Sequence, residues 1–193
     1  MALMGTLAVG LALFFAAHAV SIVAPNWRER MVAQWGTTRW RLLYSMLSLA
    51  GLLLIVKGFG MARQAPVVLY VPQVWMHRTA LVLLLPVFPL LLAAYLPGRI
   101  SAAVKHPLLL AVKCWALAHL LANGMAADLL LFGSFLAWAV ADRISLKRRV
   151  VRPVTSLAPL PLHDWLALML GLAIYGESVV WAHLKFFGVA PLS

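Results

Sequence analysis

Long apolar runs alternate with short polar segments along the chain, and the runs have the length of membrane-spanning helices. A helix needs about 20 apolar residues to cross a hydrocarbon core of ~30 Å. On this pattern we predict spans at about 3–23, 41–60, 77–97, 107–122, 125–141 and 164–187. The expected fold is therefore all-α, a polytopic membrane bundle of six transmembrane helices that forms one domain over residues 1–193.

Residues 107–141 decide the number of spans. A single helix of that length would extend roughly 50 Å, well beyond the hydrocarbon core. Asn123-Gly124 is the natural interruption, because both residues tolerate turn conformations. We therefore predict a tight hairpin of two short spans. In the third span, Pro86 and Pro89 predict a kink, because each proline removes a backbone donor.

The polar segments predict the topology. Ala24-Pro25-Asn26 ends the first span, which has no basic segment before it and is expected to be a retained helix. We expect loops after it and over 61–75. Basic residues gather in the first, third and fifth loops, and the second loop holds only Arg63. The positive-inside rule places these basic loops in the cytoplasm and both termini outside. The basic residues are Arg28, Arg30, Arg39, Arg99, Lys105, Arg143, Lys147, Arg148, Arg149 and Arg152.

Composition supports a partner that is lipid rather than nucleic acid. Hydrophobic residues make up 64% of the chain and charged residues 11%, whereas soluble domains have about half and about a quarter. The formal charge of +11 lies between apolar runs, so no nucleic-acid partner is expected. The lone cysteine, Cys114, excludes an intrachain disulfide and any metal motif built on a cysteine pair. The sequence shows no nucleophile triad, P-loop, dinucleotide fingerprint or paired carboxylates.

Two histidines within the predicted spans are candidate ligands of a planar cofactor. His18 follows Phe14-Phe15-Ala16-Ala17, and small neighbours allow a helix or a flat ligand to approach closely. His119 shares a helix face with Trp115 and Asn123. An axial ligand of a haem fits this pattern. A neutral histidine bonded to a backbone carbonyl or to a neighbouring helix fits it equally.

Other polar residues in the spans need partners, because an unpaired charge in lipid is costly. Lys113 is expected to pair with Asp128 across the hairpin or with Glu177, or to bind a cofactor carboxylate. His106 lies on the same helix face as Lys113, and His106-Pro107 also suits a plain helix start. The remaining histidines are expected at the membrane interface: His77, His163 and His183.

Four stretches resemble the NnrU family of bacterial membrane proteins. They are Lys105 to Gly124, Phe14 to Ser21, Trp40 to Gly51, and Ala127-Asp128-Leu129-Leu130-Leu131-Phe132-Gly133, and the resemblance covers nearly the whole chain. It implies a protein of the bacterial inner membrane, with periplasmic termini on the charge pattern above. It also implies a role accessory to denitrification, with nitric oxide reductase or another denitrification membrane protein as partner.

The 15-cis-zeta-carotene isomerase is similar to this family and implies a haem b held by two histidines. The matching positions here are His18 and His119, the latter in Trp115-Ala116-Leu117-Ala118-His119. His106 is the alternative partner for His18. The isomerase also has a cysteine three residues before its second histidine. That position is Ala116 here, and Cys114 lies about 200° around the helix from it.

A third resemblance is local. Lys105-His106-Pro107 is similar to the Arg-His-Pro motif of membrane methyltransferases that bind S-adenosylmethionine, and Gly176-Glu177 is the only counterpart to their acidic motif. Three classes therefore stay open: a haem-binding accessory protein, a membrane enzyme acting as isomerase or methyltransferase, and a purely structural membrane protein.

Overall fold

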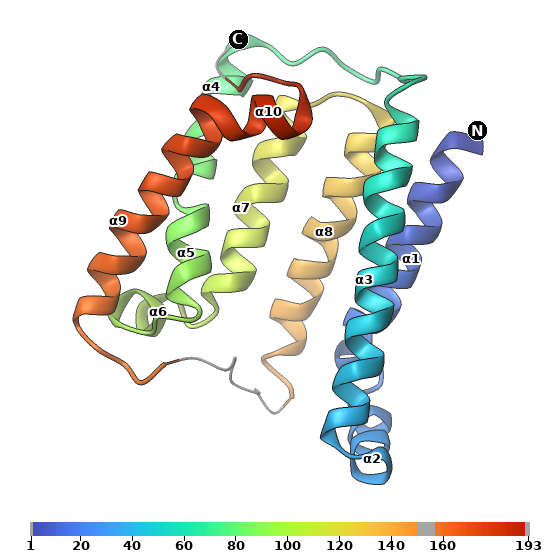
Figure 1. Cartoon of the computed structure of the whole chain (residues 1–193), viewed down its shortest axis with the longest axis vertical. Coiled ribbons are helices and arrows are strands. Elements are labelled where there is room, and N and C mark those ends of the chain that lie inside the picture. The colour runs from blue at the N-terminus through green and yellow to red at the C-terminus, as the bar shows by residue number, and fades with distance from the viewer. Residues whose placement is uncertain (1, 150–156, 192–193) are drawn as a thin grey trace. The chain divides into compact units, whose positions relative to one another are not determined.

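The computed structural model describes residues 2–149 and 157–191, and the elements of these residues are helices, joined by loops with one isolated β-bridge between Val68 and Met125 (Figure 1). The chain divides into two compact units. The first unit is Met1–Tyr70 with Met125–Arg149, and the second is Val71–Gly124 with Val150–Ser193. The prediction of one domain over 1–193 concerns both units together and stays a prediction.

The first unit is built on two long helices that run side by side, with a third packed against them (Figure 1). These helices are α1 (Ala2–Val23), α3 (Thr37–Ala62) and α8 (Ala126–Ser145). Glycines allow the backbones of α1 and α3 to approach closely, as small residues do between membrane helices. A Cβ atom at Gly10 would lie 2.6 Å from the backbone nitrogen of Ile55.

The segment after the first span is a helix rather than the predicted loop. Helix α2 (Pro25–Trp35) begins at Pro25 and ends before Gly36, whose φ of 81° suits glycine. Proline fits the first helical turn, where its missing N–H would have no partner in any case. The loop prediction over this segment was therefore wrong, because Pro25 ends α1 and also starts α2.

The second unit contains the remaining helices. They are α4 (Val74–Leu84), α5 (Val87–Ala93), α6 (Arg99–Val104), α7 (Pro107–Ala122), α9 (Leu162–Glu177), the π-helix η1 (Ser178–Ala182) and α10 (His183–Phe187). Helix α5 packs against α7 and α9. Val87, Leu90 and Ala111 form a buried cluster there. The predicted kink in the third span is confirmed, because the helix is interrupted between Leu84 and Val87, at Pro86.

The start of α9 is tied to the start of α6 and to Pro97 just before it. The two side-chain oxygens of Asp164 accept hydrogen bonds from the backbone N–H groups of Arg99, at 2.8 Å, and Ile100, at 2.9 Å. The Nδ1 of His163 lies 3.1 Å from the carbonyl oxygen of Pro97, and His163 is only 5% exposed. His163 thus packs against the protein at the start of α9, and its expected position at the membrane interface stays a prediction.

Among the described residues, four helical stretches are long and apolar enough to cross a membrane: Met4–Val23, Thr37–Ala62, Val74–Ala93 and Leu162–Phe187. Pro107–Ala122 is a shorter apolar helix. The protein is thus all-α and of the integral membrane type, while six spans and the hairpin stay predictions. The predicted break at Asn123-Gly124 is present, since α7 ends at Ala122 and α8 begins at Ala126.

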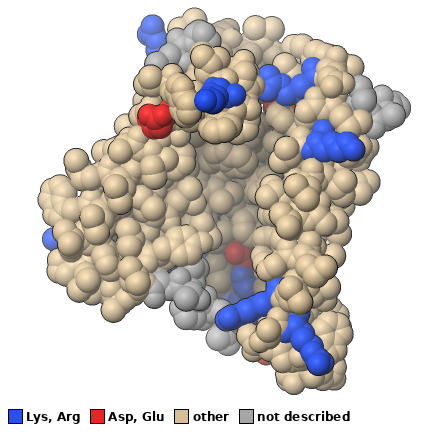
Figure 2. Space-filling view, viewed as in Figure 1, with Lys and Arg blue, Asp and Glu red and all other residues tan. Residues whose placement is uncertain are grey.

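Much of the surface consists of apolar side chains. On α3 an exposed stripe recurs every three or four residues, as one face of a helix requires. It contains Leu42, Met46, Leu49, Leu53 and Val56, each more than half exposed. Charged side chains are sparse on the face shown in Figure 2, where most of the visible atoms belong to uncharged residues. Such a surface suits lipid rather than water.

Candidate functional site

His18 of α1 is held by its own helix. Its Nδ1 lies 2.8 Å from the carbonyl oxygen of Phe14, one turn earlier. A carbonyl oxygen only accepts, so Nδ1 must carry the proton of the neutral ring. The lone pair is then on Nε2, the nitrogen that this tautomer offers to a metal. The structure therefore confirms the backbone-bonded histidine and leaves the ligand hypothesis compatible with it.

Aromatic rings from three helices of the first unit surround His18. Its ring stacks on Phe14, with centroids 3.9 Å apart and planes at 18°. Tyr44 of α3 lies 5.1 Å away and Trp138 of α8 lies 5.7 Å away, centroid to centroid. The indole N–H of Trp138 is buried and has no hydrogen-bond partner within the described part of the chain. This aromatic cluster therefore contains a donor that an acceptor of a bound molecule would satisfy.

His119 of α7 repeats the arrangement of His18 in the second unit. Its Nδ1 lies 2.9 Å from the carbonyl oxygen of Trp115, whose ring centroid is 5.3 Å from that of His119. The side-chain Nδ2 of Asn123 donates to the carbonyl oxygen of His119 at 2.9 Å. These bonds confirm that the three residues share a helix face. Two alanines that precede His119 on α7, Ala116 and Ala118, are fully buried.

His183 lies beside His119, which the sequence did not predict. The ring centroids are 6.4 Å apart and the planes meet at 36°. The Nδ1 of His183 is 2.8 Å from the carbonyl oxygen of Val189, and the ring of Phe187 lies 5.0 Å away. His183 thus packs beside a second histidine of the same unit, and its expected position at the membrane interface stays a prediction.

Two other candidates, His106 and Lys113, also lie in the second unit. His106 is the residue before α7, Pro107 is the first residue of that helix, and the plain helix start is thus confirmed. Lys113 does not form an ion pair with Glu177 in the described part of the chain, where Arg149 pairs with Asp142 of the first unit. That part of the prediction was wrong. Neither His106 nor Lys113 belongs to the His119–His183 pair.

Asp128 has a role that the sequence analysis missed. Its Oδ2 accepts a hydrogen bond from the backbone N–H of Met125 at 3.0 Å, which caps the start of α8, and the residue is 4% exposed. An acidic residue in the first turn of a helix after a break is the signal that could have found it. The pairing of Lys113 with Asp128 joins residues of different units, as does the pairing of His18 with His119, so both stay predictions.

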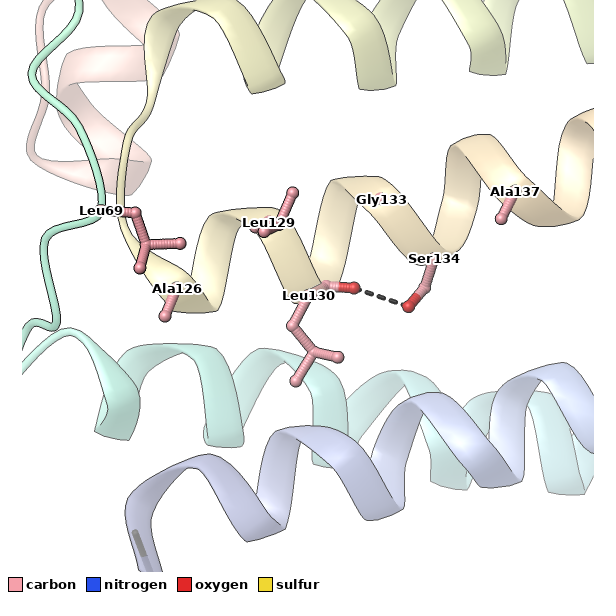
Figure 3. A pocket seen from close by; sticks show the side chains of 7 residues that line it. All are labelled: Leu69, Ala126, Leu129, Leu130, Gly133, Ser134 and Ala137. Atoms are coloured by element: carbon pink, nitrogen blue, oxygen red, sulfur yellow. Dashed lines mark hydrogen bonds between the residues drawn. The ribbon is translucent and has the colours of Figure 1, made fainter.

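An open groove of about 410 Å³ runs along α8 in the first unit. Its lining is apolar apart from Ser134, whose hydroxyl donates to the carbonyl oxygen of Leu130 at 2.6 Å (Figure 3). The groove therefore presents no polar group that would orient a polar ligand. The lining residues are Leu69, Ala126, Leu129, Leu130, Gly133, Ser134 and Ala137.

Comparisons with known proteins identify one family. The family described as "NnrU protein" matches residues 6–191, nearly the whole chain. No curated protein and no solved structure matches the chain.

Proposed function

The chain belongs to the NnrU family of proteins, and on that premise we propose that it is an integral membrane protein that binds haem b and acts as an accessory to denitrification. Six spans are proposed, in the bacterial inner membrane, with basic loops in the cytoplasm and both termini in the periplasm. Nitric oxide reductase or another denitrification membrane protein is the proposed partner. The role and the partner rest on the family resemblance.

The observation that supports haem binding best is the hydrogen bond that the Nδ1 of His18 and of His119 makes to its own helix. Each donates its Nδ1 proton to the carbonyl oxygen one turn earlier, at 2.8 and 2.9 Å. Metal-ligating histidines commonly have such a bond, which fixes the tautomer and the ring orientation and raises the basicity of the other nitrogen. His119 is proposed as one axial ligand. His18 is the candidate that the resemblance implies for the opposite position.

The surroundings of these histidines fit a haem. Aromatic rings flank both, and flat aromatic faces suit a planar macrocycle. The buried indole N–H of Trp138, near His18, would donate to a haem carboxylate. Leaving such a donor unsatisfied costs about 1–3 kcal/mol. Lys113 remains the proposed cation for a cofactor carboxylate, and His106 the alternative partner for His18. Bound haem b would supply an iron that changes oxidation state by one electron.

An absorbance spectrum of the protein purified from haem-supplied cells tests the proposal. A low-spin haem spectrum at close to one haem per chain is expected. His119→Ala should lose it, because the variant removes an axial ligand and keeps the helix. His77→Ala is the matched control: His77 lies on α4 and belongs to neither histidine cluster, so its replacement should leave the spectrum unchanged. Wild-type protein without haem would refute the proposal.

A membrane methyltransferase is the second candidate, because the backbone of the Lys105-His106-Pro107 motif has a positive φ at its first residue. Lys105 has φ 65°, the only positive value at a non-glycine residue in the described part of the chain. Such conformations cost about 1–3 kcal/mol and cluster at functional sites. Binding of S-adenosylmethionine by the wild type, lost in His106→Ala, would favour this function. An isomerase activity would instead require haem and the histidines above.

A further inference from the structure

His119 and His183 lie together in the second unit, although 64 positions separate them in the numbering. We infer that these two histidines form a bis-imidazole site, in which His183 is the second axial ligand of the haem that His119 binds. The inference rests on the proposed function and refines it, because it assigns the position opposite His119 to His183 rather than to His18.

The spacing of the two rings fits two ligands of one metal. An imidazole nitrogen lies about 2 Å from a metal, and the ring centroid about 1 Å farther, so two imidazoles in trans have centroids roughly 6 Å apart. The centroids of His119 and His183 are 6.4 Å apart. Two rings in direct contact could lie much closer, as His18 and Phe14 do at 3.9 Å. The pair is therefore already near the separation that a shared metal requires.

Both rings also have the same hydrogen-bonded nitrogen. Nδ1 of His119 donates to Trp115, and Nδ1 of His183 donates to the carbonyl oxygen of Val189. In both neutral rings the lone pair is therefore on Nε2. The second carbonyl comes from the turn after α10, where Gly188 adopts φ 70° and lets the chain fold back over His183. The carbonyl oxygen of Val189 in this turn thus accepts the Nδ1 proton of His183, as the carbonyl oxygen of Trp115 in α7 does for His119.

A π-helical turn determines the direction in which His183 points. The backbone N–H of His183 donates to the carbonyl oxygen of Ser178, five residues earlier, at the end of η1. A π turn holds one residue more than an α turn, so it rotates the residues that follow by about 100° relative to a regular helix. Such turns occur frequently at functional sites. In a continuous α-helix His183 would lie on a different face from the one that meets His119.

The ligand set favours haem over a bare metal ion. A bare transition metal ion generally needs three or four protein ligands. The described residues contain no group of three or more His, Cys, Asp or Glu side chains that could hold one. Haem iron needs only the two axial ligands, because the macrocycle fills the other four positions. Trp115 and Phe187, whose rings lie 5.3 and 5.0 Å from the two histidines, provide aromatic faces.

The test is spectroscopy of purified full-length variants in detergent, supplied with haem. The variants are His183→Ala, His119→Ala, His18→Ala and the control His77→Ala. His183→Ala should retain haem but shift from a low-spin to a high-spin spectrum, because one axial position is empty. Free imidazole should return it to low spin, which a merely structural histidine would not show. His77→Ala, at a histidine of α4 outside both clusters, should match the wild type.

Deletion of Val180 provides a variant that keeps both imidazoles. This residue is in the π turn and its side chain is 72% exposed, so the deletion converts the turn to α-helix without removing a packed group. The spectrum should become high-spin, as in His183→Ala. This variant also decides the question if His183→Ala does not fold.

Three results would overturn the inference. A wild-type spectrum in His183→Ala, with low spin lost in His18→Ala, would reject His183 and leave the proposed function standing. Loss of low spin in His183→Ala that imidazole does not restore would show that the histidine is structural. Absence of haem from the wild type would reject the proposed function and the inference together.

Discussion

A Cβ atom at Gly51 of α3 would lie 2.7 Å from the backbone nitrogen of Phe14 of α1. No real side chain tolerates this separation against a backbone, so only glycine allows the two helices to pack as they do. Phe14 is also the residue whose carbonyl holds the ring of His18. Gly51 of α3 thus allows the close approach of the turn of α1 that holds the His18 ring.

Gly51→Ala should destabilise the protein by about 1–3 kcal/mol, because the added methyl group forces α1 and α3 apart. Gly60→Ala is the matched control on the same helix, since a Cβ atom there meets nothing within 4 Å. That variant should be neutral or more stable by up to ~1 kcal/mol, as expected for glycine replaced within a helix. Unfolding in detergent, followed by circular dichroism, measures both. Equal effects of the two substitutions would contradict the close contact.

Asp128→Ala should cost about 0.5–2 kcal/mol, the usual effect of losing a helix cap. The carboxylate accepts the N–H of Met125, and alanine leaves this half-buried donor without that acceptor. Asp128→Asn keeps an acceptor oxygen and should recover most of the loss. The same unfolding measurement compares the two. If Asp128→Asn were as unstable as Asp128→Ala, a charge-dependent partner such as Lys113 would be indicated instead of the cap.

Asp164→Ala should loosen the connection between α9 and α6. Two backbone N–H groups, those of Arg99 and Ile100, lose their acceptor in this variant. We expect a lower melting temperature and faster amide hydrogen exchange at residues 98–101. Glu177→Gln, a change at an exposed carboxylate of the same helix, is the control and should leave both measurements unchanged. Unchanged exchange in Asp164→Ala would show that the two bonds do not hold α6.

Reporter fusions at Arg149 and at the C-terminus should report opposite sides of the membrane. The basic segment 143–152 is expected in the cytoplasm, and the helix over Leu162–Phe187 then carries the C-terminus to the other side. A phosphatase that is active only outside and a fluorescent protein that folds only inside give complementary readings. The same side for both positions would reject the sixth span, and an outside position of Arg149 would reject the hairpin or the orientation.

Local properties made much of the fold predictable. The ends of α7 follow from Pro107 and from Asn123-Gly124, and the interruption at Pro86 follows from a missing backbone donor. The helix α2 escaped prediction, because a proline that ends one helix also begins another. The face shared by Trp115, His119 and Asn123 could be predicted from helical periodicity alone, and the hydrogen bonds along α7 confirm it.

The sequence by itself determined the all-helical membrane character, the helix breaks and the candidacy of His18 and His119, because run length, backbone chemistry and helical periodicity act within a few residues. Only the tertiary structure decided which distant groups meet. Asp164 caps the start of α6 from 64 residues farther along the chain. His183 reaches His119 because a π turn shifts its register and the turn at Gly188 returns a carbonyl to its ring. Such contacts depend on how helices pack and on where a helix takes up an extra residue, and neither is written in the local pattern of apolar and polar positions.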